Sequence, residues 1–220
     1  MIHGNAESRV AMVAPHERLH EMHAGGRRLR VLSEALAPLL PPGARVLDVG
    51  CGDGRLALRI QARRPDITIE GAEVQLRVGT PPFSVTAFDG RTLPFADAAF
   101  DAVLSVDTLH HAEDAEALLR ECARVAPRIV LKDHLRDPWL ARPTLRFMDW
   151  VGNRRHGVSV PDDYWPRRRW EDAFARVGLE VDTLRTLALF PPPLTWVFDR
   201  GLHFTAALRR RDFVPRPPAS

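Results

Sequence analysis

The sequence predicts an α/β fold in which a seven-stranded, mostly parallel sheet carries helices on both faces. Short apolar segments alternate along the chain with segments whose apolar residues recur every three or four positions. One short segment, residues 100–106, is apolar at most positions, as expected of a strand that is covered on both faces. Strands that alternate with helices in this way are typical of parallel sheets.

The first half of the chain contains a leading helix and then strands that are separated by breaks. Residues 15–40 have leucines at helical spacing, and Pro41-Pro42-Gly43 ends the pattern. A second helix is predicted over 55–64, where Pro65-Asp66 stops it. The strands predicted around these helices are 46–49, 67–71 and 84–88.

The second half continues the alternation and adds two closing strands. After strand 100–106, helix 113–125 presents an apolar face made of Leu118, Leu119, Cys122 and Val125. Strand 128–131 follows, and the last helix is predicted over 170–177. Two final strands, 179–189 and 202–208, flank the proline-rich link Pro191-Pro192-Pro193.

Composition points to an ordinary globular protein. Of 220 residues, 45% are hydrophobic and 27% are charged. No segment approaches the roughly 20 apolar residues that span a bilayer, and the chain start lacks a secretion signal, so we expect a cytoplasmic protein without a membrane partner. The net charge is only +3 and the arginine clusters are scattered, which disfavours nucleic acid. With two cysteines we expect neither disulfides nor a metal site.

The stretch VLDVGCGDG places three glycines directly after the first predicted strand. Glycine allows positive φ and lets backbone N–H groups approach a ligand closely. The spacing G-x-G-x-G, at Gly50, Gly52 and Gly54, differs from the G-x-G-x-x-G of dinucleotide-binding turns. Because Asp48 and Asp53 add negative charge, a ligand with an amino group fits this turn better than a pyrophosphate.

Two further carboxylates follow the next two strands. Glu73 lies just beyond the second strand, where an acid can accept hydrogen bonds from both ribose hydroxyls. Asp89 ends the third strand and can accept from an exocyclic amine. One acid for an amine, one for a ribose and one for an adenine describe S-adenosylmethionine.

The segments VLDVGCGDG, EGAE and FDGRTLPFADAAFDAVLSVDTLHH, in this order, resemble a class I S-adenosylmethionine-dependent methyltransferase of the small-molecule type. The resemblance covers residues 45–135 and implies a Rossmann-like fold with S-adenosyl-L-methionine as cofactor. It implies that Asp48, Gly50 and Gly52 surround the methionine part, that Glu73 holds the ribose, and that the adenine meets Asp89 and Gly90. Around the cofactor we also expect Cys51, Val74 and Asp107.

The chain departs from that family between the second and third strands. Only VQLRVGTPPF, residues 74–83, fills the gap, and Pro81-Pro82 bars a long helix. We therefore expect this helix to be short or missing, with Val74 or Leu76 covering the adenine face.

Methyl transfer to a hydroxyl or an acidic carbon needs a base that takes the acceptor's proton. Candidates follow the fourth and fifth strands, and we favour His110 or His111, with His134 third, because histidine titrates near neutrality. The alternative for each histidine is packing against the following helix. Lys132 and Asp133 are expected to form a structural ion pair.

On the acceptor side, residues 135–169 are rich in aromatic side chains, which suit a small-molecule pocket or complete the core. Substrate-binding candidates are His20, Trp150, Arg154, His156 and Tyr164. We expect a single domain composed of a helical cap (1–44), a cofactor-binding core (45–132), a substrate-side insertion (133–169), and a closing helix and strands (170–210).

The predicted function is methylation of a small metabolite, at oxygen or carbon rather than nitrogen. RNA or protein methylation is favoured only by the arginine clusters, and DTLHH stands where an Asn- or Asp-Pro-Pro-aromatic motif marks N-methylating nucleic-acid enzymes. A protein that only binds the cofactor is a third reading, against which the retained acids and histidines argue.

Overall fold

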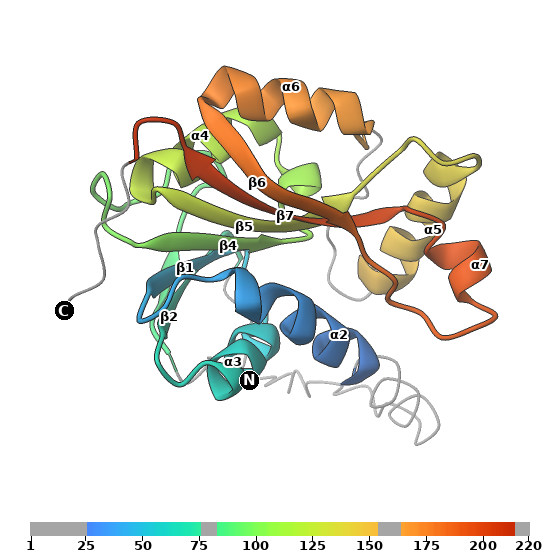
Figure 1. Cartoon of the computed structure of the whole chain (residues 1–220), viewed down its shortest axis with the longest axis horizontal. Helices are drawn as coiled ribbons and strands as arrows, with labels where there is room; N and C mark the ends of the chain where they lie inside the picture. Colours follow the sequence, from blue (N-terminus) through green and yellow to red (C-terminus); the bar gives the residue numbers. More distant parts are fainter. Residues whose placement is uncertain (1–25, 76–82, 154–163, 214–220) are drawn as a thin grey trace, which may run out of the picture.

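The computed structural model describes residues 26–75, 83–153 and 164–213. Its seven strands form one sheet in the order β3-β2-β1-β4-β5-β7-β6, and β7 is antiparallel to both of its neighbours (Figure 1). This confirms the predicted seven-stranded, mostly parallel sheet. The strands are β1 (Arg45–Val49), β2 (Thr68–Glu73), β3 (Val85–Ala87), β4 (Ala102–Val106), β5 (Arg128–His134), β6 (Leu179–Thr186) and β7 (His203–Arg210).

Helices cover both faces of this sheet. On one face lie α2 (Gly26–Leu36) and α3 (Arg55–Arg63), and on the other lie α4 (Ala115–Val125) and α6 (Arg167–Val177) (Figure 1). Two hydrophobic cores result, one between each pair of helices and the sheet. No helix among the described residues is long and apolar enough to cross a membrane.

Local chemistry explains where these helices begin and end. Gly54 precedes α3 with a φ of 73°, a conformation that glycine adopts without strain. The Asp114 carboxylate caps α4 by accepting a hydrogen bond from the Ala117 amide at 2.9 Å. Helix α6 begins directly after Pro166 and ends at Val177, before Gly178, whose φ is 81°.

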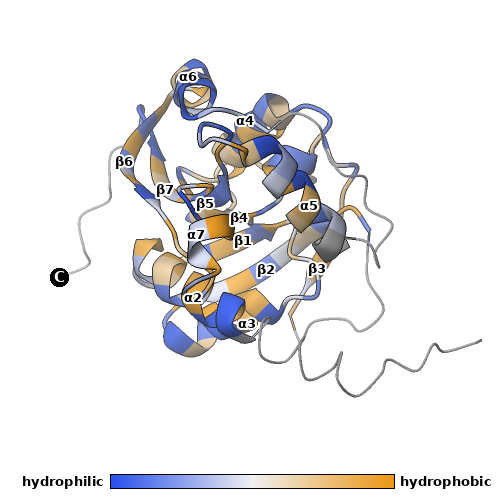
Figure 2. Cartoon of the chain, turned by 90° about the vertical axis from the view of Figure 1, so that its right-hand side faces the viewer, coloured by the Kyte–Doolittle hydropathy of each residue, from blue (hydrophilic) through white to orange (hydrophobic). Residues whose placement is uncertain are grey.

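Four shorter or peripheral elements complete the chain. The 3₁₀ turns η2 (Ala37–Leu39) and η3 (Leu109–His111) follow α2 and β4. Helices α5 (Ala141–Asn153) and α7 (Thr195–Phe198) lie together beyond one end of the sheet, as Figures 1 and 2 show from two sides. The proline-rich link between β6 and β7 thus contains a helix that the sequence reading lacked.

The parallel strands bring their carboxyl ends to the sheet edge next to α5. Because β7 runs the opposite way, its first residue lies at this same edge, and His134 pairs with His203 in the register of β5 and β7. Strand β5 is three residues longer than predicted, since β7 pairs with it along its whole length. The described part of the predicted leading helix is α2, and the gap between β2 and β3 includes residues 76–82, outside the described residues.

Candidate functional site

The glycine turn after β1 is held tightly against its neighbours. The Gly50 amide donates to the Ala72 carbonyl at 2.8 Å, which joins the turn to β2. Gly50 has a φ of 74°, and a Cβ there would lie 2.6 Å from Thr108 Cγ2, so no larger residue fits. Thr108 in turn donates from its hydroxyl to the Val49 carbonyl at 3.1 Å. The turn therefore lies at the carboxyl ends of β1 and β4, where the strand order reverses. Ligands of such sheets usually bind at this point.

Three carboxylates lie at the ends of three adjacent strands, in the order β1, β2 and β3. Asp48 is buried within β1. Glu73 ends β2, and its carboxylate accepts from the Gly52 amide at 2.8 Å and the Val74 amide at 2.9 Å. Asp89, exposed after β3, uses Oδ1 to accept from the backbone of the turn that follows, which lowers its pKa. The three acids therefore follow one another across three adjacent strands.

Asp48 carries a pKa far from its ordinary value. Burial, reinforced by the negative charge of Glu73, raises the pKa of Asp48 from 3.8 to about 7. A cation placed at this carboxylate would relieve both effects. The site is thus electrostatically prepared for a positively charged group at the end of β1.

A histidine and an aspartate form a buried pair at the end of β4 and β5. His110 Nδ1 lies 2.7 Å from Asp133 Oδ1, and both side chains are almost inaccessible. Burial alone would lower the pKa of His110, but the negative charge of Asp133, with Asp107 and Asp149, holds it above its usual value. A hydrogen on Nδ1, bound to Asp133, leaves Nε2 as the acceptor nitrogen, and Nε2 has no hydrogen-bond partner among the described residues.

Three more histidines lie near this pair: His111 and His134, which were predicted candidates, and His203, which was not. Burial and the neighbouring His110 lower the pKa of His111 to about 4. His134 is buried, and burial and the charge of Lys132 lower its pKa. The ring of His203 lies 5.0 Å from that of His134 and 6.4 Å from that of Phe190. Burial and the charge of Lys132 also lower the pKa of His203, so three of the four imidazoles are favoured in the neutral form.

The sequence analysis predicted an ion pair between Lys132 and Asp133, and this prediction is wrong. The Lys132 ammonium instead binds Asp107 Oδ1, and Arg28 binds Asp107 Oδ2 at 2.5 Å. Successive strand residues point to opposite faces of a sheet, so Lys132 and Asp133 cannot share one face. Asp107, expected beside the cofactor, is thereby tied to α2 and β5.

Asp149 is a site residue that the sequence analysis missed. It lies on α5, accepts a hydrogen bond from the Tyr164 hydroxyl, and its Oδ2 is 3.7 Å from His110 Nε2. Leu145 and Asp149 are both buried and lie four residues apart, on one helix face. The sequence signal for Asp149 was its position four residues after Leu145, on the apolar face of the same helix.

Of the five predicted substrate-binding residues, the structure describes Tyr164 and Trp150. Tyr164 is fully buried beside Asp149. Trp150 is about half exposed on α5. Leu76, a candidate for the adenine face, lies outside the described residues, as do three substrate candidates, His20, Arg154 and His156.

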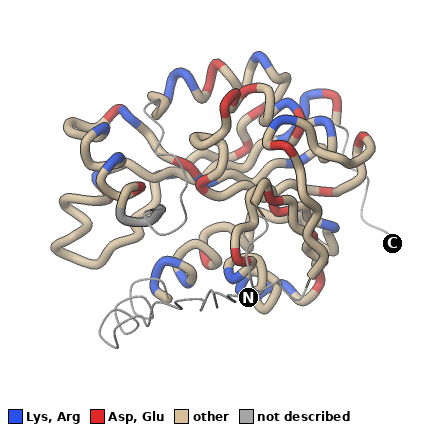
Figure 3. The backbone as a smooth tube through the Cα atoms, turned by 180° about the vertical axis from the view of Figure 1, so that it is seen from behind, with Lys and Arg blue, Asp and Glu red and all other residues tan. Residues whose placement is uncertain are grey.

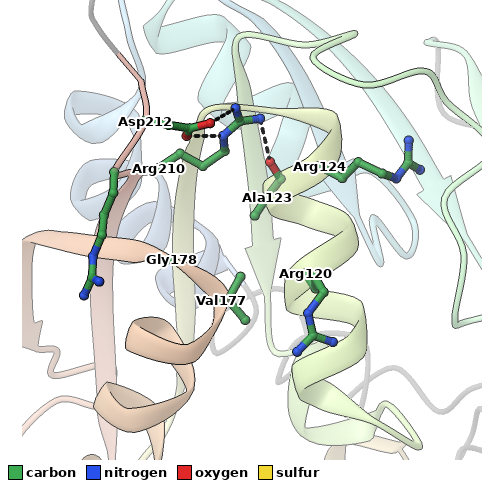
Figure 4. A pocket seen from close by; sticks show the side chains of 8 residues that line it. Arg120, Ala123, Arg124, Val177, Gly178, Arg210 and Asp212 are labelled. Atoms are coloured by element: carbon green, nitrogen blue, oxygen red, sulfur yellow. Dashed lines mark hydrogen bonds and ion pairs between the residues drawn. The ribbon is translucent and has the colours of Figure 1, made fainter.

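Several arginines of the clusters are paired with acids where they are described. Arg167 pairs with Glu171 at 2.9 Å, Arg209 with Asp182 at 2.9 Å, and Arg210 with Asp212 at 2.6 Å. Blue and red segments accordingly intermingle along the backbone (Figure 3). A hollow of about 400 Å³ lies beside Arg210 and Gly178, between α4, α6 and the C-terminal end of β7 (Figure 4), and none of the site histidines lines it. It adds nothing to the site.

Comparison with known proteins gives the family. Residues 47–128 match the model of a methyltransferase domain. The matched segment is a class I S-adenosylmethionine-dependent methyltransferase domain. The matched range contains the glycine turn, Glu73, Asp89 and His110, so the family match and the site geometry concern the same part of the molecule.

Relatives of this chain are named for different substrates. The 27-O-demethylrifamycin SV methyltransferase of Amycolatopsis mediterranei is 34% identical over 49% of the chain and 45% of that protein. Ajmaline N-methyltransferase of Rauvolfia serpentina is 29% identical over 71% of the chain and 62% of that protein. The chain thus spans 45% to 62% of the length of these two relatives.

Solved structures share the fold at low sequence identity. A methyltransferase of Thermotoga maritima, described as a possible histamine N-methyltransferase, superposes with a TM-score of 0.64 at 20% identity. The match covers 89% of the present chain and 96% of that one. A methyltransferase of Mesorhizobium loti superposes with a TM-score of 0.60 at 17% identity, covering 83% and 100% of the two chains.

The residues at these strand ends fit the cofactor that the matched family implies. S-adenosylmethionine presents an ammonium, two ribose hydroxyls and an adenine amine, and carboxylates accept from all three. Asp48, Glu73 and Asp89 provide them in strand order, and the Gly50 turn leaves room only for backbone. Of the remaining expected contacts, Val74 is more than half exposed at the crevice, and Cys51 is buried in the turn.

Two sets of described side chains are also close enough to share a metal ion. They are Asp107, His110, Asp133 and His134, and separately His110, His111 and Asp149. In the first set, Lys132 and Arg28 already bind both oxygens of Asp107, so added positive charge is opposed. The second set offers a single carboxylate, and a metal there would compete with a proton for His110 Nε2.

Proposed function

We propose that the chain transfers the methyl group of S-adenosylmethionine to an oxygen or carbon of a small-molecule acceptor, with His110 as the general base. When bound, the cofactor supplies a methyl group on a sulfonium, which a nucleophile can displace. Asp48 with Gly50 and Gly52 would hold its methionine part, Glu73 its ribose, and Asp89 its adenine. We further propose one domain, divided as the sequence predicts, that works in the cytoplasm.

One observation carries the choice of base: the buried 2.7 Å contact between His110 Nδ1 and Asp133 Oδ1. A carboxylate that accepts the Nδ1 hydrogen fixes the imidazole tautomer and stabilises the imidazolium that forms when Nε2 takes a proton. His111, with a pKa lowered to about 4, would hold a proton weakly. His134 has Lys132 beside it, and that charge opposes protonation.

The surroundings of His110 support a neutral acceptor group that loses a proton to the base, such as a hydroxyl. Asp149 lies 3.7 Å from Nε2, which is beyond hydrogen-bond length, and Tyr164 binds the Asp149 carboxylate. These groups can orient an acceptor hydroxyl toward Nε2, and the buried setting excludes bulk water. The named relatives, which methylate an O-demethylrifamycin and ajmaline, support a small-molecule acceptor.

Glu73→Ala should weaken S-adenosylmethionine binding by roughly 10- to 100-fold, because a carboxylate that binds hydroxyls contributes about 1.5–3 kcal/mol. Titration calorimetry measures the change. Glu70→Ala, on the same strand and paired with Arg45, is the matched control and should bind normally. Equal affinities for wild type and Glu73→Ala would remove the ribose assignment.

A metabolite extract incubated with methyl-labelled S-adenosylmethionine and the protein tests the function itself. We expect label in compounds of low molecular mass, identified by mass spectrometry, and an equal yield in a parallel sample with EDTA, because His110 acts as a base and not as a metal ligand. Label confined to RNA or protein would reject the small-molecule acceptor. If EDTA abolished methyl transfer, the proposal that His110 acts as a base without a metal ion would be rejected.

A further inference from the structure

Two carboxylates flank the imidazole of His110, one at each ring nitrogen. Asp133 Oδ1 lies 2.7 Å from Nδ1, and Asp149 Oδ2 lies 3.7 Å from Nε2. The side chain of His110 is 2% exposed, that of Asp133 is inaccessible, and that of Asp149 is 11% exposed. Two buried acids thus share one imidazole, which can carry only a single positive charge.

The other described groups around this set do not supply a second cation. Burial, together with a neighbouring positive charge, lowers the pKa values of His111 and His134, so both are favoured in the neutral form. The ammonium of Lys132 binds Asp107, and Arg28 binds the same carboxylate. These two cations thus neutralise a third acid, and the pair of acids at the imidazole keeps an excess of negative charge. Buried charge of this kind is stabilised by a partner of opposite sign.

Asp149 is the acid of this pair that an acceptor can reach. The Asp133 carboxylate is inaccessible, and its Oδ1 also accepts from the His134 amide at 2.8 Å. The Asp149 carboxylate accepts from the Tyr164 hydroxyl, and its ion-pair partner within the described part of the chain is His110, beyond hydrogen-bond length. A carboxylate has about four acceptor positions, so Asp149 can bind a further donor that arrives with the acceptor.

We propose that the methyl acceptor carries a protonated basic nitrogen, which Asp149 binds while His110 Nε2 receives the proton of a neighbouring hydroxyl or acidic carbon. This inference rests on the proposed methyl transfer and names the class of its acceptor. Because the two receiving atoms are 3.7 Å apart, the nitrogen and the nucleophilic group must lie close together in the acceptor. The protonated nitrogen has no free electron pair, so it positions the acceptor and does not take the methyl group.

A cation at Asp149 also suits the chemistry of His110. Burial lowers the pKa of His110, but the negative charges of Asp133, Asp107 and Asp149 outweigh burial and favour the imidazolium, which cannot accept a proton. An ammonium at Asp149 offsets one of these charges and therefore favours the neutral imidazole once the acceptor is bound. As the acceptor oxygen bonds to the methyl carbon, its proton passes to Nε2, and the electron pair of the broken carbon–sulfur bond stays on sulfur.

Fractionation of a metabolite extract tests the acceptor class. At about pH 3 amines are charged and carboxylates are largely protonated, so a strong cation exchanger retains compounds that have a basic nitrogen. The retained and unretained pools are neutralised and incubated separately with the protein and S-adenosylmethionine that carries a deuterated methyl group. Mass spectrometry then identifies the labelled products. We expect at least about tenfold more labelled product from the retained pool, with the methyl group on oxygen or carbon.

Substitution of Asp149 tests which group binds the nitrogen. Asp149→Asn removes the charge and keeps the shape, so Tyr164 can still donate to the side chain. With an acceptor purified from the retained pool, this variant should raise KM by about 10- to 100-fold, because a charge-assisted hydrogen bond is lost. Its affinity for S-adenosylmethionine, measured by calorimetry, should equal that of wild type. Asp149→Glu restores the charge and should recover part of the loss in KM. Asp172→Asn, at an exposed acid of α6, is the matched control and should change neither quantity.

Three results would overturn the proposal. These are label mainly in products of the unretained pool, a methyl group on the basic nitrogen itself, or a KM that Asp149→Asn leaves unchanged. The first two concern wild-type protein, so they decide the question even if a variant fails to fold. Label in small molecules without a basic nitrogen would remove this inference alone, whereas an absence of label from both pools would also reject the proposed methyl transfer.

Discussion

His110→Ala lowers the rate of methyl transfer by about 10²- to 10⁴-fold and leaves the affinity for S-adenosylmethionine unchanged, because it removes the proton acceptor and no cofactor contact. Single-turnover experiments with labelled cofactor measure the rate, and calorimetry measures the affinity. His111→Ala is the matched control, since its pKa of about 4 makes it a weak base, and it should retain most activity. The reverse pattern would move the base to His111.

The pH dependence separates a base from a packing residue. His110 must be neutral to accept a proton, so kcat/KM should rise with pH through its pKa, which lies above the usual value of about 6.5. Asp133→Asn removes the charge that raises this pKa, and the rise should move to lower pH while the maximal rate falls. A profile that Asp133→Asn does not shift would contradict the paired base.

Asp48→Asn raises stability and weakens cofactor binding at the same time. The folded pKa of about 7 lies above the unfolded value of 3.8, so the stability that Asp48 contributes is lost as pH rises toward 7. Replacing the acid should therefore add about 2–4 kcal/mol to the free energy of unfolding at pH 8 and little at pH 4. Thermal unfolding at both pH values measures this.

Whereas Asp48→Asn should raise stability, it should weaken cofactor binding, because it removes the negative charge that would pair with the cofactor ammonium. We expect at least about tenfold weaker binding by Asp48→Asn at pH 8. Wild-type affinity should also fall as pH drops below about 7, where Asp48 takes up a proton. Asp53→Asn, an exposed acid five residues on, should change neither stability nor affinity. A variant that is less stable at pH 8 and binds normally would contradict this account.

Much of the fold could be predicted because strands and helices have local signals. The apolar run at β4 and the breaks at Pro41-Pro42-Gly43 and Pro65-Asp66 placed the elements to within a few residues. The full length of β5 could not be predicted, since its last three residues are polar and are strand only because β7 pairs with them. The α7 helix is a single short turn among prolines, with no periodicity to detect.

The cofactor side of the site was more predictable than the reaction side. Asp48, Glu73 and Asp89 each lie at or near the carboxyl end of a strand, and the sheet order brings strand ends together. The partners of His110 depend on tertiary contacts: Asp133 comes from β5 and Asp149 from α5. The expected Lys132–Asp133 pair was wrong because the predicted strand ended at residue 131, whereas both residues lie in β5 and point to opposite faces. Naming the true partners, Asp107 and His110, required the arrangement of β4, η3 and β5.

The most direct test is a crystal structure of the chain with S-adenosylhomocysteine, the product of the cofactor. We predict the amino group at Asp48, the ribose hydroxyls at Glu73, the adenine amine at Asp89, and the sulfur on the side of the crevice that faces His110. An adenosine group bound elsewhere, or a sulfur on the far side from His110, would contradict the account.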